Sequence, residues 1–168
     1  MRCWRLLPLL VLALPASAGT SWITHTDAAG GFAVALPGEP ERESTSHLTL
    51  AGRVRSEVVI AFAGSAEFRV EVHDLPVLAR WFVSDTGLLE RAAAGLLEDE
   101  EALRSSATDG REAGHPARTV TYEDAEGRPG EARIVFAAGR LYVRVAQWPP
   151  GDRELAGRVR FFDSFVLR

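Results

Sequence analysis

The side chains best suited to acid–base chemistry or metal binding are four histidines, set among 23 acidic residues. His25 lies two residues before Asp27, and His73 is followed directly by Asp74. A metal site needs three or four converging ligands, and the sequence contains no H-x-x-x-H, H-E-x-x-H or EF-hand spacing. We therefore expect no metal ion and no cofactor. His73 ends an alternating segment on its polar face, so we expect it to be a surface histidine.

His115 is the histidine with the most specific context, because Gly114 precedes it and Pro116 follows it. Proline restricts the preceding residue to extended backbone, so the structural interpretation is a turn that leads into a strand. The catalytic interpretation is a small hydrolase that uses Asp or Glu together with His115 as a general base. No nucleophile accompanies His115 in the sequence, and no G-x-S-x-G, P-loop or G-x-G-x-x-G motif occurs. We assign no catalytic residue and no partner-binding residue.

Aromatic and charged residues do not select a binding partner. Tyr122, Tyr142, Trp81 and Trp148 could line a binding face, although aromatic residues at strand spacing more often belong to a core. Every basic residue is arginine, and the arginines are interspersed with acidic residues. Because there is no basic patch, nucleic acid is not an expected partner.

The first 18 residues have the pattern of a secretory signal peptide. Arg2 and Arg5 precede an apolar run at residues 6–14, and small residues at 16–18 form a cleavage motif. The apolar run is too short to span a bilayer. We expect cleavage after Ala18 and a periplasmic or secreted protein without a membrane span.

The expected mature chain, residues 19–168, has the length of a single domain. The only cysteine, Cys3, lies in the leader, well before the cleavage motif, so it is not the lipid-bearing residue of a lipoprotein. The mature chain would thus contain no disulfide and no thiol chemistry. Loss of the leader leaves 17 arginines against 23 acidic residues, a net charge of about −6.

The elements that must position any site centre on residues 114–148, which predict three consecutive antiparallel strands. Apolar residues alternate on both sides of the segment 132–147, so we expect cover on both faces of this part of the sheet. A turn at Ala138-Gly139 would place Arg133 opposite Arg144, a like-charge pair that weakens a ladder. A turn at Gly139-Arg140 avoids this pair, and we favour it.

Further strands are predicted at residues 21–26, 32–36, 47–50, 53–63 and 67–73, with a weak strand at 109–113 and polar loop or frayed edge at 41–46. The one-sided polarity of residues 67–73 indicates an edge strand or an uncovered part of the sheet. One helix is predicted after an N-cap at Ser84 or Asp85, with Leu89, Ala92, Ala93 and Leu96 forming its apolar stripe. The acidic run 98–101 either follows the helix end near Leu97 or is a solvated face. A last helix, capped by Asp152, would bury Leu155, Val159 and Phe162.

Four short blocks occur in a suggestive order: FAVALPGEP at 32–40, GHP at 114–116, GRLYV at 139–143 and FFDSF at 161–165. They resemble blocks of small secreted bacterial proteins of the PsbP-like superfamily, which includes the extrinsic lumenal subunit of photosystem II and DcrB-like lipoproteins. The resemblance implies an α+β fold, an α/β/α sandwich with a central, mostly antiparallel sheet of about six or more strands. It also implies a non-enzymatic accessory role on a larger complex. The chain lacks the lipoproteins' cysteine at the cleavage site, and no functional residue is carried over.

Together, these observations predict an exported, non-enzymatic accessory protein that binds an envelope or extracellular protein. Two alternatives remain. One is a small-ligand carrier with a cleft between sheet and helix, and the other is the small hydrolase that uses His115.

Overall fold

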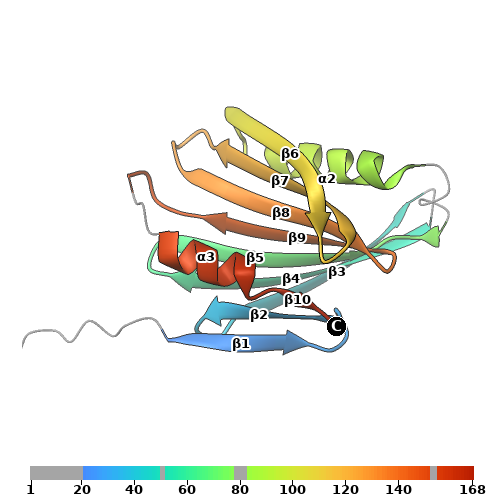
Figure 1. Cartoon of the computed structure of the whole chain (residues 1–168), viewed down its shortest axis with the longest axis horizontal. Coiled ribbons are helices and arrows are strands. Elements are labelled where there is room, and N and C mark those ends of the chain that lie inside the picture. Colours follow the sequence, from blue (N-terminus) through green and yellow to red (C-terminus); the bar gives the residue numbers. More distant parts are fainter. Residues whose placement is uncertain (1–20, 50–51, 78–82, 152–154) are drawn as a thin grey trace, which may run out of the picture.

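The alternating segments of the sequence form strands of two antiparallel sheets in a computed structural model, which describes residues 21–49, 52–77, 83–151 and 155–168 (Figure 1). Some sequence predictions lie outside these residues or outside the described side chains: the leader at 1–18, Leu50 at the end of a strand, Trp81, the helix cap at Asp152 and the burial of Leu155.

The larger sheet has seven strands in the described part of the chain, and every neighbouring pair is antiparallel. Their order is β3 (Glu41–Thr49), β4 (Gly52–Ala63), β5 (Ala66–Asp74), β9 (Arg140–Gln147), β8 (Pro129–Ala137), β7 (His115–Glu123) and β6 (Arg104–Glu112). The smaller sheet joins β1 (Trp22–Asp27), β2 (Phe32–Pro37) and β10 (Val166–Leu167).

Both faces of the large sheet are covered. Helix α2 (Asp85–Asp99) packs on β7 and β8, while α3 (Leu155–Asp163) and the small sheet lie on the other face (Figure 1). The alternation in the central hairpin divides its side chains between two cores: Ile134 and Val143 face α2, whereas Val135 and Tyr142 face α3 and β2. The predicted α+β class, antiparallel sheet and two-sided cover are confirmed.

The turn between β8 and β9 consists of Ala138 and Gly139, so the predicted turn at Gly139 and Arg140 is wrong. Both central residues have positive φ, 50° for Ala138 and 82° for Gly139. A type I′ turn requires this, and its twist matches that of the flanking strands. As a result, Arg133 lies directly opposite Arg144.

The like-charge pair is tolerated because each guanidinium has its own carboxylate. Arg144 Nη2 lies 2.5 Å from Glu112 Oε2, and Arg133 Nε lies 3.1 Å from Glu131 Oε1. The sequence shows the repulsion between the two arginines but not their carboxylate partners, because the approach of Glu112 depends on how the β6–β7 hairpin packs. Backbone geometry therefore determined the turn.

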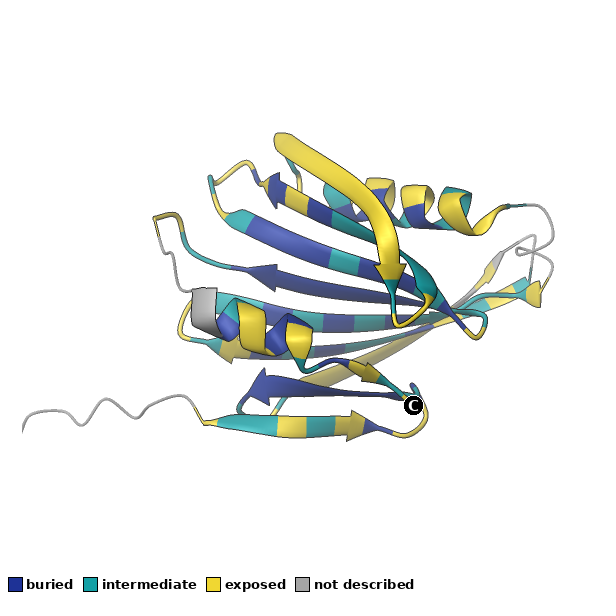
Figure 2. Ribbon diagram, viewed as in Figure 1, coloured by how far each residue is buried: buried dark blue, intermediate teal, exposed yellow. Residues whose placement is uncertain are grey.

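The edges of the sheet also differ from the sequence predictions. Residues 41–46 belong to the edge strand β3, and all of residues 104–112 form the opposite edge strand β6, well beyond the weak strand predicted at 109–113. Both edges are polar and exposed, and Figure 2 shows β6 exposed along almost its whole length. The polar composition of these segments did not predict strands. An edge strand whose two faces are both exposed to solvent needs no alternation of apolar residues.

Strand β5 is an interior strand between β4 and β9, so its interpretation as a sheet edge is wrong. Its polar face lies on the α2 side, where Arg69 bonds to carboxylates of Glu67, Glu71 and Glu100 at 2.5–2.7 Å. Glu100 is the C-cap of α2. The helix continues to Asp99 rather than ending near Leu97, because Arg69 compensates the negative charge at its C-terminus.

The start of α2 is as predicted: Gly87 N donates to Ser84 Oγ at 3.1 Å, and Leu89, Ala93 and Leu96 are buried. Helix α3 buries Phe162 as predicted, but the prediction for Val159 is wrong: it is 45% exposed, and Phe161 is buried instead. Neither helix in the described part of the chain combines the length and apolarity needed to cross a bilayer.

Replacing Ala138 with Asn should raise the free energy of unfolding by about 1 kcal/mol, because a left-handed conformation costs Ala roughly that much and Asn-Gly suits a type I′ turn. Urea denaturation measures the change. Ala125→Asn is the matched control, an exposed loop alanine without positive φ. A loss of stability at position 138, or an equal gain at position 125, would contradict this assignment of the turn.

Candidate functional site

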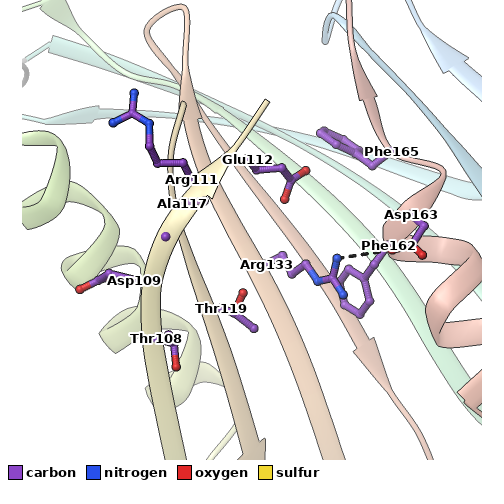
Figure 3. Close-up of a pocket in the computed structure, with 11 residues that line it drawn as sticks. Thr108, Asp109, Arg111, Glu112, Ala117, Thr119, Arg133, Phe162, Asp163 and Phe165 are labelled. Atoms are coloured by element: carbon purple, nitrogen blue, oxygen red, sulfur yellow. Dashed lines mark ion pairs between the residues drawn. The ribbon is translucent and has the colours of Figure 1, made fainter. Parts of the chain in front are cut away.

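A groove of about 570 Å³ lies between the β6–β7 hairpin and the C-terminal end of α3. Its strand wall includes Thr108, Glu112 and Thr119, and its other wall is formed by Phe162 and Phe165. Figure 3 shows Arg133 over the Phe162 ring, with an ion pair to Asp163 at the mouth. The groove thus combines an aromatic wall with hydroxyl and charged groups.

Arg144, whose side chain is fully buried, contacts residues of both walls of the groove. Its guanidinium carbon lies 4.2 Å from the centre of the Phe165 ring, and Nη1 donates to the Phe162 carbonyl at 3.4 Å. Nη2 bonds to Glu112, whereas Nε has no hydrogen-bond partner among the described residues. Burial lowers the pKa of Arg144, and the hydrogen bond and charge of Glu112 offset this only in part. Arg144 therefore ties the β6–β7 turn to the C-terminal segment.

Arg133 forms a second, more exposed charge centre on the same face. Its guanidinium lies 4.5 Å from the centre of the Phe162 ring, and Nη1 is 3.6 Å from Asp163. Glu131, which binds Arg133 on one side, also accepts from Arg158 at 3.1 Å. The charged residues that line the groove are of both signs, so it suits a polar segment better than a ligand of one charge: Asp109, Arg111, Glu112, Arg133 and Asp163.

A second cavity, of about 310 Å³, lies on the opposite face of the sheet, between α2 and strands β4, β5 and β9. Its apolar walls come from Val54, Leu75, Ala92, Leu96, Leu141 and Val143. Ser56, Glu71, His73 and Asp99 supply its polar groups. The predicted cleft between sheet and helix therefore exists as a small, partly apolar space.

Within this second cavity, His73 is not the surface histidine that the sequence predicted. Its side chain is 24% exposed, and both ring nitrogens have partners. Nδ1 lies 2.8 Å from Ser56 Oγ, and Nε2 lies 3.1 Å from Glu71 Oε2. Ser56 and His73 are direct partners in the β4–β5 register. Sequence reasoning missed this cluster because Ser56 lies 17 residues before His73 and only the register joins them.

Glu71 is held as a carboxylate. Burial alone would raise the pKa of Glu71, but the hydrogen bond from His73 and the charge of Arg69 outweigh it and lower that pKa. Arg69 Nε donates to Glu71 Oε1 at 2.7 Å, which leaves Oε2 for the histidine.

The other predicted site residues lie apart from both cavities. His115 begins β7 opposite Glu112 and lines neither the groove nor the second cavity. His25 Nε2 is 3.0 Å from Arg42 Nη2, and burial followed by the Arg42 charge lowers the pKa of His25. The geometry gives no support to a hydrolase based on His115.

The tyrosines named as binding candidates serve packing. Tyr122 and Tyr142 are buried, and the Tyr142 hydroxyl donates to the Gly30 carbonyl at 3.0 Å. Trp148 is partly buried and has Arg158 5.3 Å above its ring. Among the residues that the structure describes, no three His, Cys, Asp or Glu side chains are grouped as a metal ion would need.

Replacing Glu112 with Ala should lower the free energy of unfolding by about 2 kcal/mol, because it removes the charged hydrogen-bond partner of the buried Arg144. Arg144→Met should cost less, since it removes the buried charge and frees Glu112, which is one-third exposed, to face water. Chemical denaturation of both variants gives the comparison.

The control for this comparison is Asp109→Ala, which breaks the ion pair of an exposed carboxylate with Arg118 on the same hairpin. It should change the free energy of unfolding by no more than about 1 kcal/mol. A larger loss for Arg144→Met than for Glu112→Ala would show that the buried charge is not what ties the hairpin to α3.

Comparisons with known proteins identify the fold. Neither a scan against protein-family models nor a search of curated protein sequences gives a match. Among solved structures, the chain is similar to the solution structure of cyanobacterial PsbP (CyanoP) from Synechocystis sp. PCC 6803, with a TM-score of 0.58 and 14% sequence identity. The similarity covers 94% of this chain and 99% of that one. The chain therefore has a PsbP-like fold.

Proposed function

We propose that the protein is an exported accessory protein that binds a protein partner without catalysing a reaction. The observation that carries this proposal is the PsbP-like fold across nearly the whole chain, combined with a groove that adjoins an open sheet edge. The accessory roles implied by the superfamily resemblance point in the same direction, and no nucleic acid is needed as a partner.

The edge strand β6 is the place where we expect the partner to bind. β6 is nine residues long, and β7 is its one neighbour among the residues that the structure describes, so within this part of the chain the backbone groups along its other side are open to a further strand. Residues 105–108 carry only small side chains, which leave room for an incoming backbone. An extended peptide bound by strand addition takes its affinity from such main-chain hydrogen bonds.

The groove defines the chemistry of that peptide. Phe162 and Phe165 can receive one apolar side chain, while Arg133 and Asp163 at the mouth favour polar neighbours of either charge. We therefore expect an extended, mostly polar segment with an apolar residue facing α3. Charged side chains discourage strand addition. In the opposite edge strand β3 they stand together at Glu41, Arg42 and Glu43, whereas β6 has an uncharged run at residues 105–108.

Site-specific photocrosslinking tests this interface. A photoreactive residue at Thr108 should capture one defined protein in a lysate of the source organism, whereas the same residue at Thr45 on β3 should not, although both threonines are exposed edge residues. Excess unmodified protein should abolish the crosslink, and a Thr108→Trp competitor with a filled groove should not. Equal capture at both positions, or none at Thr108, would refute the proposed interface.

Export gives a separate prediction. N-terminal sequencing of the protein expressed from its full reading frame in a Gram-negative host should show Gly19 as the first residue of the exported protein. Replacing Leu9 and Leu10 with Arg should retain an uncleaved precursor, because it destroys the apolar run. A wild-type protein that keeps residues 1–18 in the soluble cell fraction would contradict export.

A small-ligand carrier is the second candidate function, and the cavity beside α2 favours it. Its volume of about 310 Å³ is near the lower limit of ligand pockets. The cavity lies on the face opposite the groove, so partner binding at β6 and occupancy of this cavity do not compete for space.

A further inference from the structure

Ser56, His73 and Glu71 form a hydrogen-bonded series whose direction can be assigned. A carboxylate only accepts hydrogen bonds, so His73 Nε2, 3.1 Å from Glu71 Oε2, must carry a proton. In the neutral imidazole, Nδ1 is then an acceptor. In that neutral state, the Ser56 hydroxyl, 2.8 Å away, donates its proton to Nδ1. This is the arrangement of a nucleophile, a general base and a group that orients the base.

Rigid elements hold the series in place. Ser56 and His73 face each other on neighbouring interior strands, and Glu71 lies two residues before His73 on the same face of β5. Arg69 fixes Glu71 through a 2.7 Å bond to its other oxygen. The three side chains also line the cavity beside α2, so a small molecule in that cavity would lie against Ser56.

We propose that Ser56 is an activated serine that accepts an acyl or phosphonyl group from small, neutral activated esters in this cavity. The class of reagent follows from the lining. Leu96, Leu141 and Val143 offer apolar surface to a short acyl chain, while Glu71 and Asp99 disfavour anionic reagents. This chemistry is separate from partner binding, because the cavity lies on the face of the sheet opposite the groove.

The reaction balances without a further reactant. Ser56 Oγ bonds to the carbonyl carbon or phosphorus, and its proton passes to His73 Nδ1. The bond to the leaving group then breaks, and the leaving oxygen or fluoride takes that proton from His73. The product is acyl-Ser56 or phosphonyl-Ser56. Glu71 is a positioning residue that stabilises the imidazolium between the two steps.

The surroundings of Ser56 favour a single transfer over rapid turnover. Strand β4 pairs with β3 on one side and β5 on the other, so its backbone N–H groups are engaged in the two ladders. They cannot form an oxyanion hole, and loss of one such donor slows catalysis by about 10²–10³-fold. This slows the formation and the hydrolysis of the adduct alike, so only a reagent with a good leaving group should react, and the adduct, whose leaving group is the serine alkoxide, should persist. Ser56 is thus a covalent acceptor rather than the nucleophile of a fast enzyme.

Intact-mass measurement and peptide mapping test the proposal on the full chain. p-Nitrophenyl acetate and a fluorophosphonate should each add one group, on Ser56, and Ser56→Ala should abolish the adduct. Ser106 is the internal control, an exposed serine that bonds to Thr121 and not to a histidine. It should stay unlabelled. Adducts spread over several residues, or none on Ser56, would refute the proposal.

His73→Ala separates an activated serine from a merely structural hydrogen bond. It should slow the labelling of Ser56 by about 100-fold or more, as loss of a general base does, and added imidazole should restore part of the rate. If this variant does not fold, as judged by circular dichroism, His73→Asn still accepts the Ser56 hydroxyl but cannot take its proton. An unchanged rate in a folded His73 variant would overturn the role of His73.

Discussion

A single buried charge constrains much of this structure. Arg144 lies on the middle strand of the sheet with no exposed surface, and a guanidinium in that position must be paired. Glu112, the last residue of β6, supplies the carboxylate, while Phe162 and Phe165 supply a carbonyl and an aromatic face. The requirements of one side chain thus bring an edge hairpin and the C-terminal segment together, and the groove is the space between them.

On both faces of the large sheet, arginine side chains determine how the neighbouring polar groups are arranged. The sequence contains no lysine, and on each face one or two arginines contact several acceptors or aromatic rings. Arg144 and Arg133 organise the α3 face around aromatic rings, whereas Arg69 collects three glutamates on the α2 face. This second network fixes Glu71, and through it the orientation of the His73 ring. A stabilising network on one strand therefore also arranges a serine and a histidine beside a cavity.

Local pattern was a good guide wherever one face of an element is buried. The alternation around Ile134 and Val135, the N-cap at Ser84 and the stripe of Leu89, Ala93 and Leu96 all lie as predicted. It was a poor guide at the edges, since β3 and β6 bury little and so show no alternation. At Val159 the predicted stripe was wrong, because α3 turns Phe161 and Phe162 inward and leaves Val159 exposed.

The sequence by itself determined which residues share a face, where α2 begins, and that no familiar catalytic or metal-binding spacing is present. Those properties depend on side chains a few residues apart, whose relative directions follow from the repeat of a strand or helix. Only the tertiary structure decided the turn at Ala138-Gly139, the partners of Arg144 and the approach of Ser56 to His73. These features depend on strand register and on how the layers pack. A shift of one residue in the register would move Ser56 away from His73 and Arg133 away from Arg144.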